Sequence, residues 1–416
     1  MPFSDVNKFL WVFVLSLCVN AFVVITKKHH IGQSARIFDQ IAVQAMHRTP
    51  TPRIGGVGVV LALLVAFLVL MRAPDRSYWL LFALSIAPIF LAGLAEDLGY
   101  GVSPVRRLLA AAFSSVICVI LLGIWVPRAD IPLVDYIFTY APFAILFTIF
   151  AASGISHAFN LIDGTNGLAA GIGVFVALGL AAIATKAGEA SISIAVSYMV
   201  PALLGFMIMN YPFGKIFLGD AGAYAVGHVL AWVAIALLAR SEALTTWAIM
   251  LVFFWPVADT MLAIYRRRRS GKSAGQPDRL HFHQLVMRTL EIAYFGRKRR
   301  HIANPLTALV VLPLASVPVI TGVLLWNQPL AAFAAFILFS VLFFSSYLLG
   351  MRFAYGMARG LNKSARRAHI DAASKARSSA TPMHSQPPEA ATPPWVATKE
   401  STRVIGQERR QARDRH

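Results

Sequence analysis

Long apolar segments separated by short polar ones run along most of the chain. Each apolar segment has about 18 residues or more, enough for a helix rising ~1.5 Å per residue to cross a ~30 Å hydrocarbon core. The pattern predicts an all-α polytopic membrane protein with about eleven transmembrane helices. The expected spans are residues 9–26, 54–71, 78–95, 108–126, 135–152, 167–185, 191–209, 221–239, 244–265, 303–325 and 329–350.

Composition agrees with a membrane protein. Hydrophobic residues make up 57% and charged residues 14% of the chain, whereas a soluble domain is about half apolar and about a quarter charged. The first apolar segment, 9–26, lacks a basic leader and a small-residue cleavage site, so it is interpreted as a retained span. Cys18 and Cys118 both lie inside apolar segments, which excludes a disulfide framework and a cysteine-based metal site.

The formal net charge of +19 is interpreted as a sign of membrane topology rather than of nucleic-acid binding. Lys and Arg concentrate in the cytoplasmic loops of membrane proteins. Together with an odd number of spans, the charge distribution predicts an outside N-terminus and a cytoplasmic C-terminus. Most Lys and Arg residues fall in the C-terminal tail and in loops 27–53, 96–107, 153–166, 210–220 and 266–302.

A change in composition near residue 361 predicts the domain organisation. Residues 1–361 form the expected polytopic domain, with the chemically unusual loops between 36 and 290. Residues 362–416 are basic and rich in Ser, Ala and Pro. This composition is too poor in apolar residues to form a core. We expect a disordered cytoplasmic tail and assign it no chemistry.

The polar segment 157–167 interrupts the apolar sequence between two expected spans. Asn160, Asp163 and Asn166 are spaced three apart, so they would share one face of a helical turn. Carboxylate and carboxamide oxygens suit a hard cation or a polar ligand. Alone, the segment also fits a plain connecting turn. Four further polar loops on the same side of the membrane favour a site.

Two of those loops place acidic residues at the ends of spans. Glu96 and Asp97 end one span. Adjacent carboxylates there are costly unless they are solvated, paired or bound to a cation, and simple helix-end polarity is the alternative. Asp220 stands between two glycines at the start of another span, where a ligand can approach the backbone. Its carboxylate is a candidate metal ligand. Phe217 fits either stacking on a base or an interfacial anchor.

The other two loops carry cationic side chains and histidines. Arg53 precedes Gly55 and Gly56 at the start of a span, where a helix N-terminus can hold a phosphate. A positive charge at the membrane edge is the simpler alternative. His281 and His283 lie in an Arg-rich loop and fit phosphate contacts or proton transfer. A zinc site is not expected, because no third His or Cys ligand lies at a suitable spacing.

Taken together, these loops resemble the polyprenyl-phosphate N-acetylhexosamine-1-phosphate transferase family (glycosyltransferase family 4). Its superfamily also contains phospho-N-acetylmuramoyl-pentapeptide transferase. The resemblance covers residues 36–290 and the layout of about eleven spans, with the active site formed by cytoplasmic loops. The matching motifs are Pro50-Thr51-Pro52-Arg53-x-Gly55-Gly56, Glu96-Asp97, Asn160-x-x-Asp163-Gly164-x-Asn166-Gly167, Phe217-x-Gly219-Asp220-Ala221-Gly222 and Pro277-Asp278-Arg279-x-His281-x-His283.

The resemblance implies a reaction and its participants. Undecaprenyl phosphate, or another polyprenyl phosphate, attacks the β-phosphorus of a UDP-N-acetylhexosamine, releasing UMP and priming a cell-surface polysaccharide such as O-antigen. The implied cofactor is Mg²⁺, with Mn²⁺ as the alternative. The partners are the two substrates and the membrane, with no nucleic acid, and a homodimer is left open. Phosphoryl transfer fits the residues, because it depends on positioning and charge neutralisation.

The resemblance also implies roles for individual residues. Glu96, Asp97 and Asp163 match catalytic acids, and Asp97 is assigned to the lipid phosphate, with a role as base left open. Asp220 matches a metal-binding Asp, and Asp163 is a second candidate ligand of the metal. The residues matched to substrate binding are Asn160, Asn166, Asn210, Phe217, Arg279, His281, His283, Arg53 and, less directly, Asp39.

Three positions depart from the usual motifs of the family. Glu96 replaces the first Asp of an Asp-Asp pair, Asn166 replaces an Asp and Ala223 replaces a Ser. The first two departures shift the expected chemistry onto Asp97, Asp163 and Asp220. They also favour the hexosamine branch over the muramoyl-pentapeptide branch. A membrane transporter is the rival from another class, but the acids of transporters usually lie in mid-span.

Overall fold

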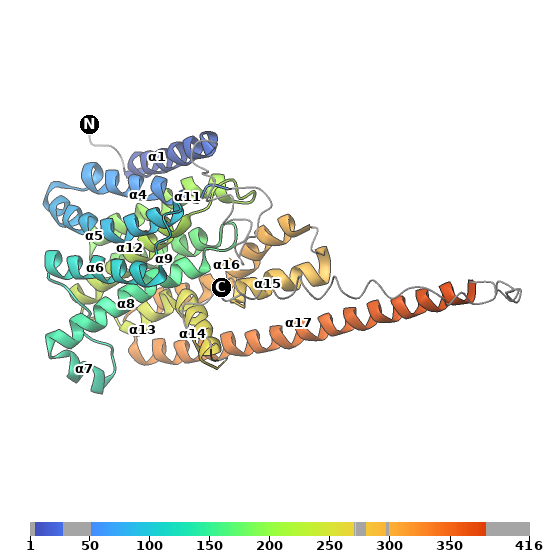
Figure 1. Cartoon of the computed structure of the whole chain (residues 1–416). Coiled ribbons are helices and arrows are strands. Elements are labelled where there is room, and N and C mark those ends of the chain that lie inside the picture. The colour runs from blue at the N-terminus through green and yellow to red at the C-terminus, as the bar shows by residue number, and fades with distance from the viewer. Residues whose placement is uncertain (1–4, 28–50, 270, 272–279, 297–298, 380–416) are drawn as a thin grey trace, which may run out of the picture. The chain divides into compact units, whose positions relative to one another are not determined.

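The computed structural model describes residues 5–27, 51–269, 271, 280–296 and 299–379, and every regular element within them is helical (Figure 1). The prediction of an all-α protein is confirmed. The elements are α1 (Asp5–Ile25), α4 (Gly56–Val65), the π-helical η1 (Ala66–Leu70), α5 (Ala73–Asp97), α6 (Pro104–Leu122), α7 (Pro132–Phe138), α8 (Ala141–Ile162), α9 (Leu168–Lys186), α10 (Ala190–Ser197), α11 (Met199–Asn210), α12 (Gly219–Arg240), α13 (Thr246–Val252), α14 (Phe254–Arg269), α15 (Phe282–Leu290), the π-helical η2 (Glu291–Phe295), α16 (Arg300–Leu324) and α17 (Pro329–Ser379).

The protein is a multi-pass membrane protein. Among the described residues, nine helices are long and apolar enough to cross a bilayer, and counting the bent pair α13–α14 as one span gives ten. All eleven expected spans coincide with helices. The expected span 54–71 is the exception in length, because its helical segment Gly56–Leu70 is shorter than the others.

Two expected spans differ in detail from the helices. Residues 244–265 form two helices that meet at an angle of 79°. Pro256 has no backbone N–H to donate to the carbonyl of Val252, which weakens a continuous helix at this point. The span expected at 135–152 is instead α8, which runs to Ile162 and carries Asn160 on its last turn.

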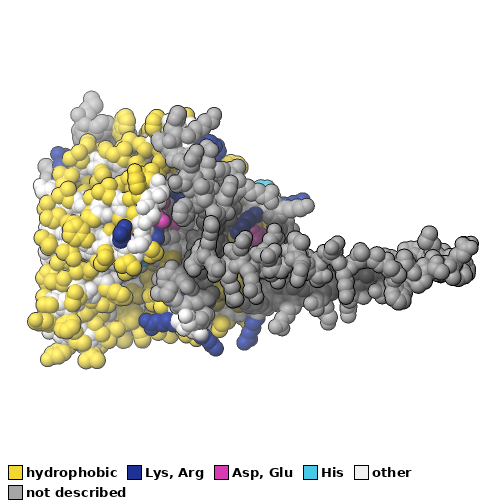
Figure 2. Space-filling view, viewed as in Figure 1, with side chains coloured by type: hydrophobic (Ala, Val, Ile, Leu, Met, Phe, Trp, Pro, Cys, Tyr) yellow, Lys and Arg dark blue, Asp and Glu magenta, His cyan; other side chains and the backbone are white. Residues whose placement is uncertain are grey.

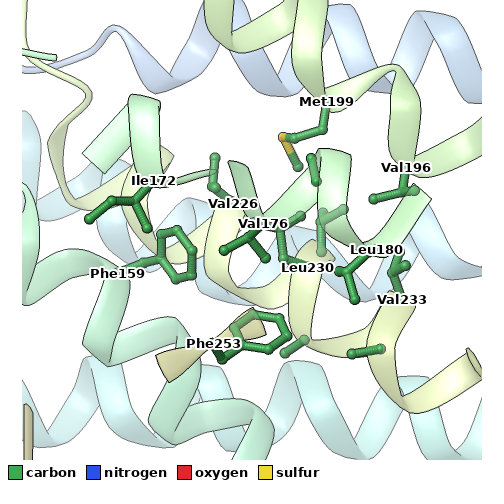
Figure 3. Close-up of a cluster of buried hydrophobic side chains, with 14 of the residues drawn as sticks. Phe159, Ile172, Val176, Leu180, Val196, Met199, Val226, Leu230, Val233 and Phe253 are labelled. Atoms are coloured by element: carbon green, nitrogen blue, oxygen red, sulfur yellow. The ribbon is translucent and has the colours of Figure 1, made fainter. Parts of the chain in front are cut away.

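The central helix of the bundle is α12, which packs against α4, α5, α8 and α9 (Figure 1). All of its residues from Gly219 to Leu238 are buried. Its apolar side chains, including Val226, Leu230 and Val233, meet side chains of neighbouring helices in a dense core (Figure 3). The helix therefore has a fixed position, and its first turn carries Asp220.

Glycines bring the neighbouring helices close to the first turns of α12. A Cβ on Gly56 of α4 would collide with the backbone of Gly222. A Cβ on Gly93 of α5 would lie 2.6 Å from the Cα of Ala221. On the outside of the bundle, hydrophobic side chains cover most of the described surface at the left of Figure 2, as expected for a surface in contact with lipid.

The chain divides into two compact units, Met1–Gly360 and Leu361–His416. The first unit contains all of the candidate membrane spans. Residues 362–379 continue helix α17, which corrects the expectation of a disordered tail beginning at residue 362. The frequent Ala, Lys and Arg residues in this stretch have high helix propensity. The remainder of the expected tail, 380–416, lies outside the described residues.

Candidate active site

Two carboxylates hold the N-terminus of α12. The backbone N–H groups of Asp220 and Ala221 donate to Asp97 Oδ1 and Oδ2, each at 2.9 Å. The N–H of Gly219 donates to Asp163 Oδ2 at 3.2 Å. These N–H groups have no partner within a helix, and the helix dipole favours negative charge beside them. Acids from three separate motifs therefore meet at one helix end.

The third acid of this cluster, Asp220, is held by cationic and amide groups. Its Oδ2 forms an ion pair with Arg107 of α6. Its Oδ1 accepts a hydrogen bond from Asn160 Nδ2 at 3.0 Å and lies 3.6 Å from Arg53 Nη2. Arg53 Nε is also 4.0 Å from Asp97 Oδ1. The predicted association of Arg53, Asn160 and the three aspartates is thus present.

Backbone pairing joins two of the motifs. Phe217 donates its N–H to Pro52 and accepts from the N–H of Gly55, both at 2.9 Å. The N–H of Gly56 donates to Leu218 O. The two amides at the start of α4 therefore already have protein partners, which removes them from the expected phosphate contact. Phe217 places a half-buried side chain beside this pairing.

Gly219 links the pairing to the acid cluster. Its φ of +74° lies in the left-handed region, where glycine is strongly preferred. A Cβ at this position would also collide with Arg53 O and would lie 2.6 Å from Asp97 Oδ2. Glycine at this position therefore lets the chain turn sharply into α12 while Asp97 stays in contact.

The side-chain carboxamides of Asn166 and Asn210, both matched to substrate binding from the sequence, connect loops. Asn166 is buried and donates from Nδ2 to Pro212 O at 2.8 Å. Asn210 accepts from the N–H of Gly167 at 2.6 Å and donates to Ile216 O at 2.7 Å. Because α8 ends at Ile162, Asn166 does not continue the face of Asn160 and Asp163, contrary to the expectation from spacing.

The two histidines lie at the start of α15. His281 Nδ1 is 2.9 Å from Asp259 Oδ2, and the two imidazole rings stack with centroids 5.7 Å apart. His283 is 1% exposed, and neither of its ring nitrogens has a hydrogen-bond partner in the described part of the chain. Its Nε2 would lie 3.1 Å from a Cβ on Gly164. His283 therefore reaches the central motif.

Burial perturbs two titratable groups outside the spans. It raises the pKa of Asp163 to about 7, although Arg53 acts in the opposite direction. It lowers the pKa of His283 to about 4, against the influence of the Asp259 carboxylate. Such perturbed groups gathered in one region are typical of functional sites.

Comparison with known proteins identifies the region. The model of the family described as "Glycosyl transferase family 4" matches residues 79–238, which include Asp97, Asp163 and Asp220. Over these residues the chain is similar to glycosyl transferase family 4. The family match therefore covers the helices that assemble the acid cluster.

The curated relatives of the chain are distant. An undecaprenyl-phosphate alpha-N-acetylglucosaminyl 1-phosphate transferase from Yersinia pestis is 23% identical over 68% of this chain and 76% of its own. The protein of the same name from Escherichia coli K12 is 27% identical, over 62% and 71%. A decaprenyl-phosphate N-acetylglucosaminephosphotransferase from Mycobacterium tuberculosis H37Rv is 28% identical, over 61% and 69%.

Several polar residues of this site had been given no role from the sequence. Arg107 had been attributed only to topology, yet it contacts Asp220. His157 packs edge-on against Tyr224, with centroids 4.7 Å apart. Among the described residues, His157 Nε2 is a buried atom without a hydrogen-bond partner, and so is Oε2 of Glu96, which had been matched to a catalytic acid. The placement of His157 three residues before Asn160, on the same helical face, was the available signal.

Two more residues that had been given no role from the sequence support the loops, and both lie far from those loops along the chain. Asn304 of α16 accepts a hydrogen bond from the N–H of Asn166 at 2.9 Å. Asp259 of α14 contacts His281. Both are far from their partners in sequence, so no local pattern relates them. The predicted site residues Asp39 and Arg279 lie outside the described residues.

The donor set fits a hard divalent cation. Mg²⁺ commonly takes one or two protein carboxylates and completes its shell with water and substrate phosphates. Asp163 and Asp220 both adjoin Gly219 at the start of α12. Among the residues described, no group of three or more His, Cys, Asp or Glu is placed to hold a metal ion.

Proposed function

We propose that the protein transfers an N-acetylhexosamine 1-phosphate from a UDP-sugar to polyprenyl phosphate. The observation that carries the proposal is the meeting of Asp97, Asp163 and Asp220 with Arg53 and Arg107 at one helix end. The names of the relatives from three bacteria point to the same reaction class. The acids lie at the ends of helices rather than in mid-span, which argues against a transporter.

The proposed step breaks and makes one bond at phosphorus. An oxygen of the lipid phosphate bonds to the β-phosphorus of the UDP-sugar. The bond from that phosphorus to the oxygen bridging to the α-phosphorus breaks, and UMP leaves. Positioning and charge stabilisation supply most of the catalysis in such reactions. The guanidinium groups of Arg53 and Arg107, at the acid cluster, would stabilise charge on phosphate oxygens. Asp97 holds the helix that presents Asp220.

We further propose that Asp220 and Asp163 hold a Mg²⁺ ion, for which Mn²⁺ is the alternative. The ion would supply positive charge to the diphosphate. The charge balance supports this assignment, because the carboxylates of the cluster outnumber its guanidinium groups and leave negative charge for a cation to neutralise. Asp220→Asn should lower the transfer rate and raise the Mg²⁺ concentration needed for half-maximal activity. An unchanged rate and Mg²⁺ requirement would remove Asp220 from the metal site.

The proposed membrane arrangement follows the charge distribution. We place the site on the cytoplasmic side of a bacterial inner membrane, with the N-terminus outside and the C-terminus inside. A site at helix ends can receive a soluble nucleotide from the aqueous side and a lipid tail from the bilayer. Labelling of single cysteines introduced at Arg72 and at residues 101–103, on the two sides of α5, would test this arrangement, since they should react from opposite sides.

The decisive experiment measures UMP release by purified protein. Undecaprenyl phosphate and Mg²⁺ are supplied with a panel of UDP-sugars: UDP-GlcNAc, UDP-GalNAc, 6-deoxy analogues and UDP-MurNAc-pentapeptide. We expect release with at least one UDP-N-acetylhexosamine and formation of a lipid-linked diphosphate sugar. Release only with the pentapeptide substrate would assign the protein to the muramoyl branch. Absence of UMP with every sugar would refute the proposed reaction.

A further inference from the structure

Asp259 is a buried carboxylate that the reaction proposed above does not use. It lies on α14 and is 0% exposed. Its Oδ1 accepts the N–H of Phe282 at 2.9 Å, and its Oδ2 lies 2.9 Å from Nδ1 of His281. A buried carboxylate is costly unless its oxygens are matched by donors. Both oxygens of Asp259 are matched, one by a helix end and one by an imidazole.

We propose that Asp259 is a positioning residue that fixes His281 with its proton on Nδ1 and its Nε2 presented to the sugar-diphosphate. A carboxylate accepts hydrogen bonds and cannot donate them. Nδ1 must therefore carry the proton in this contact, which leaves Nε2 as the ring atom available to a ligand. This inference rests on the proposed function for its catalytic half.

The same carboxylate fixes the ring and the helix that carries it. His281 is the residue immediately before α15, and Phe282 is the first residue of that helix. Asp259 therefore determines where α15 begins as well as how the imidazole is turned. The backbone N–H of His281 is held by Gln284 Oε1 at 3.3 Å. Rotation of the ring would require loss of the Asp259 contact.

Neighbouring aromatic residues hold this unit in place. Phe282 lies 5.0 Å from Trp255 and 5.1 Å from Phe343, measured between ring centroids. Tyr347 donates its hydroxyl hydrogen to Leu280 O at 3.1 Å. The start of α15 is thus anchored to α14 and to α17, so Asp259 acts from a rigid support.

The second histidine connects this unit to the acid cluster. His283 Nδ1 is 3.9 Å from Asp259 Oδ2, beyond hydrogen-bond distance, and its ring stacks on that of His281. The Nε2 atom of His283 adjoins Gly164, the residue after Asp163. Through this stack, the orientation set by Asp259 extends to the central motif.

The test uses Asp259→Asn in the full-length protein. An Asn offers one acceptor oxygen and one donor NH₂. If the oxygen keeps the N–H of Phe282, the NH₂ faces Nδ1 and moves the ring proton to Nε2. We expect kcat for the UDP-sugar that the panel identifies to fall at least about tenfold, as for carboxylates that support metal-bound histidines. KM should change much less, because the change affects the presented atom rather than overall binding.

A double-mutant cycle separates positioning from general stability. If Asp259 acts through His281, Asp259→Asn should cost little further activity in a His281→Ala background. Equal losses in both backgrounds would overturn the inference. Asp130→Asn is the matched control. Asp130 also caps a helix, accepting from the N–H of Thr246 at 2.7 Å, but it contacts no described histidine. The kcat of the Asp130→Asn variant should therefore stay near that of the wild type.

A measurement that does not depend on enzyme activity distinguishes the proposed role of Asp259 from the proposed reaction. Nitrogen NMR of ¹⁵N-histidine-labelled protein in detergent, with His281→Gln to assign the signal, reports which ring nitrogen carries the proton. We expect a proton on Nδ1 in the wild type and on Nε2 in Asp259→Asn. A wild-type ring protonated only on Nε2 would refute the role of Asp259 even if transfer is active. The expected tautomers in an inactive protein would refute the proposed reaction instead.

Discussion

The carboxylate of Asp97 accepts a hydrogen bond from the backbone N–H of Asp220 at 2.9 Å. The two residues lie on different helices, at the end of α5 and the start of α12. The resemblance assigns Asp97 to the lipid phosphate and Asp220 to the metal, and the structure links the two physically. Asp97 therefore determines where the Asp220 backbone lies, whatever it does to a substrate.

Asp97→Asn should lower both stability and activity. An Asn side chain has one acceptor oxygen, so only one of the two N–H groups held by Asp97 keeps its partner. Loss of a cap of this kind costs about 1 kcal/mol. We expect a lower thermal unfolding midpoint in detergent, together with slower UMP release. Glu242→Gln, in an exposed loop, serves as the control. Slower release at an unchanged midpoint would indicate a purely chemical role for Asp97.

Gly219→Ala should abolish transfer, and Gly154→Ala should not. The methyl group at 219 would meet Arg53 O and Asp97 Oδ2 in a backbone conformation with φ +74°. In contrast, nothing lies within 4 Å of a Cβ on Gly154, which is inside α8. An Ala there should be neutral or stabilise the helix by up to about 1 kcal/mol. Rates of UMP release at equal protein concentration test the pair, and an active Gly219→Ala enzyme would contradict the packing argument.

Asn166→Asp should destabilise the protein rather than restore a catalytic acid. Asn166 Nδ2 donates to Pro212 O at 2.8 Å, in a site where the residue is 2% exposed. An Asp would replace this donor by an acceptor and leave buried polar groups unsatisfied, at a cost of about 1–3 kcal/mol. Thermal unfolding and transfer rate should both fall. A faster enzyme would instead reveal a dormant carboxylate role at this position.

The burial of His283 predicts that the free energy of unfolding decreases at acid pH. Burial holds its pKa at about 4, below the usual 6.5. Between these values the unfolded chain binds a proton that the folded protein does not, so stability falls as pH falls, by up to about 1.4 kcal/mol per pH unit. Asp163, with a pKa raised to about 7, acts with the opposite sign over part of this range.

Comparison with His283→Gln isolates the histidine from other groups. The difference in unfolding midpoint between the wild type and this variant cancels the contribution of Asp163, which both proteins share. We expect the wild type to lose stability relative to the variant as pH is lowered from about 6.5 to about 4. Parallel curves for the two proteins would show that His283 is not held neutral by the fold.

The sequence predicted the helical fold and much of the site for identifiable reasons. Hydropathy alone located a helix at each of the eleven expected spans, because crossing a bilayer demands long apolar segments. Residues 244–265 had been taken as one span, and the signal that Pro256 offers for the break between α13 and α14 was not used. The grouping of Asp97, Asp163 and Asp220 followed from motifs that all fall at helix ends.

Contacts between distant segments were beyond sequence reasoning. Asp97 was expected to face substrate, but it also caps α12, and nothing within 96–107 encodes that partner. Asn210 was matched to substrate binding, yet both ends of its amide are engaged by protein backbone. Asp259 sits 22 positions before His281 in a segment that resembles any apolar span. Such residues become visible only when the helices are placed in three dimensions.

The burial of α12 has a consequence for how the protein responds to its bilayer. Peripheral helices adapt to a thicker or thinner membrane by tilting, and such movements strain whatever they carry. Every residue in the apolar window of α12 is buried inside the protein, so this helix is shielded from the lipid that exerts the strain. Asp220 is therefore mounted on the part of the molecule least sensitive to membrane thickness and lipid composition.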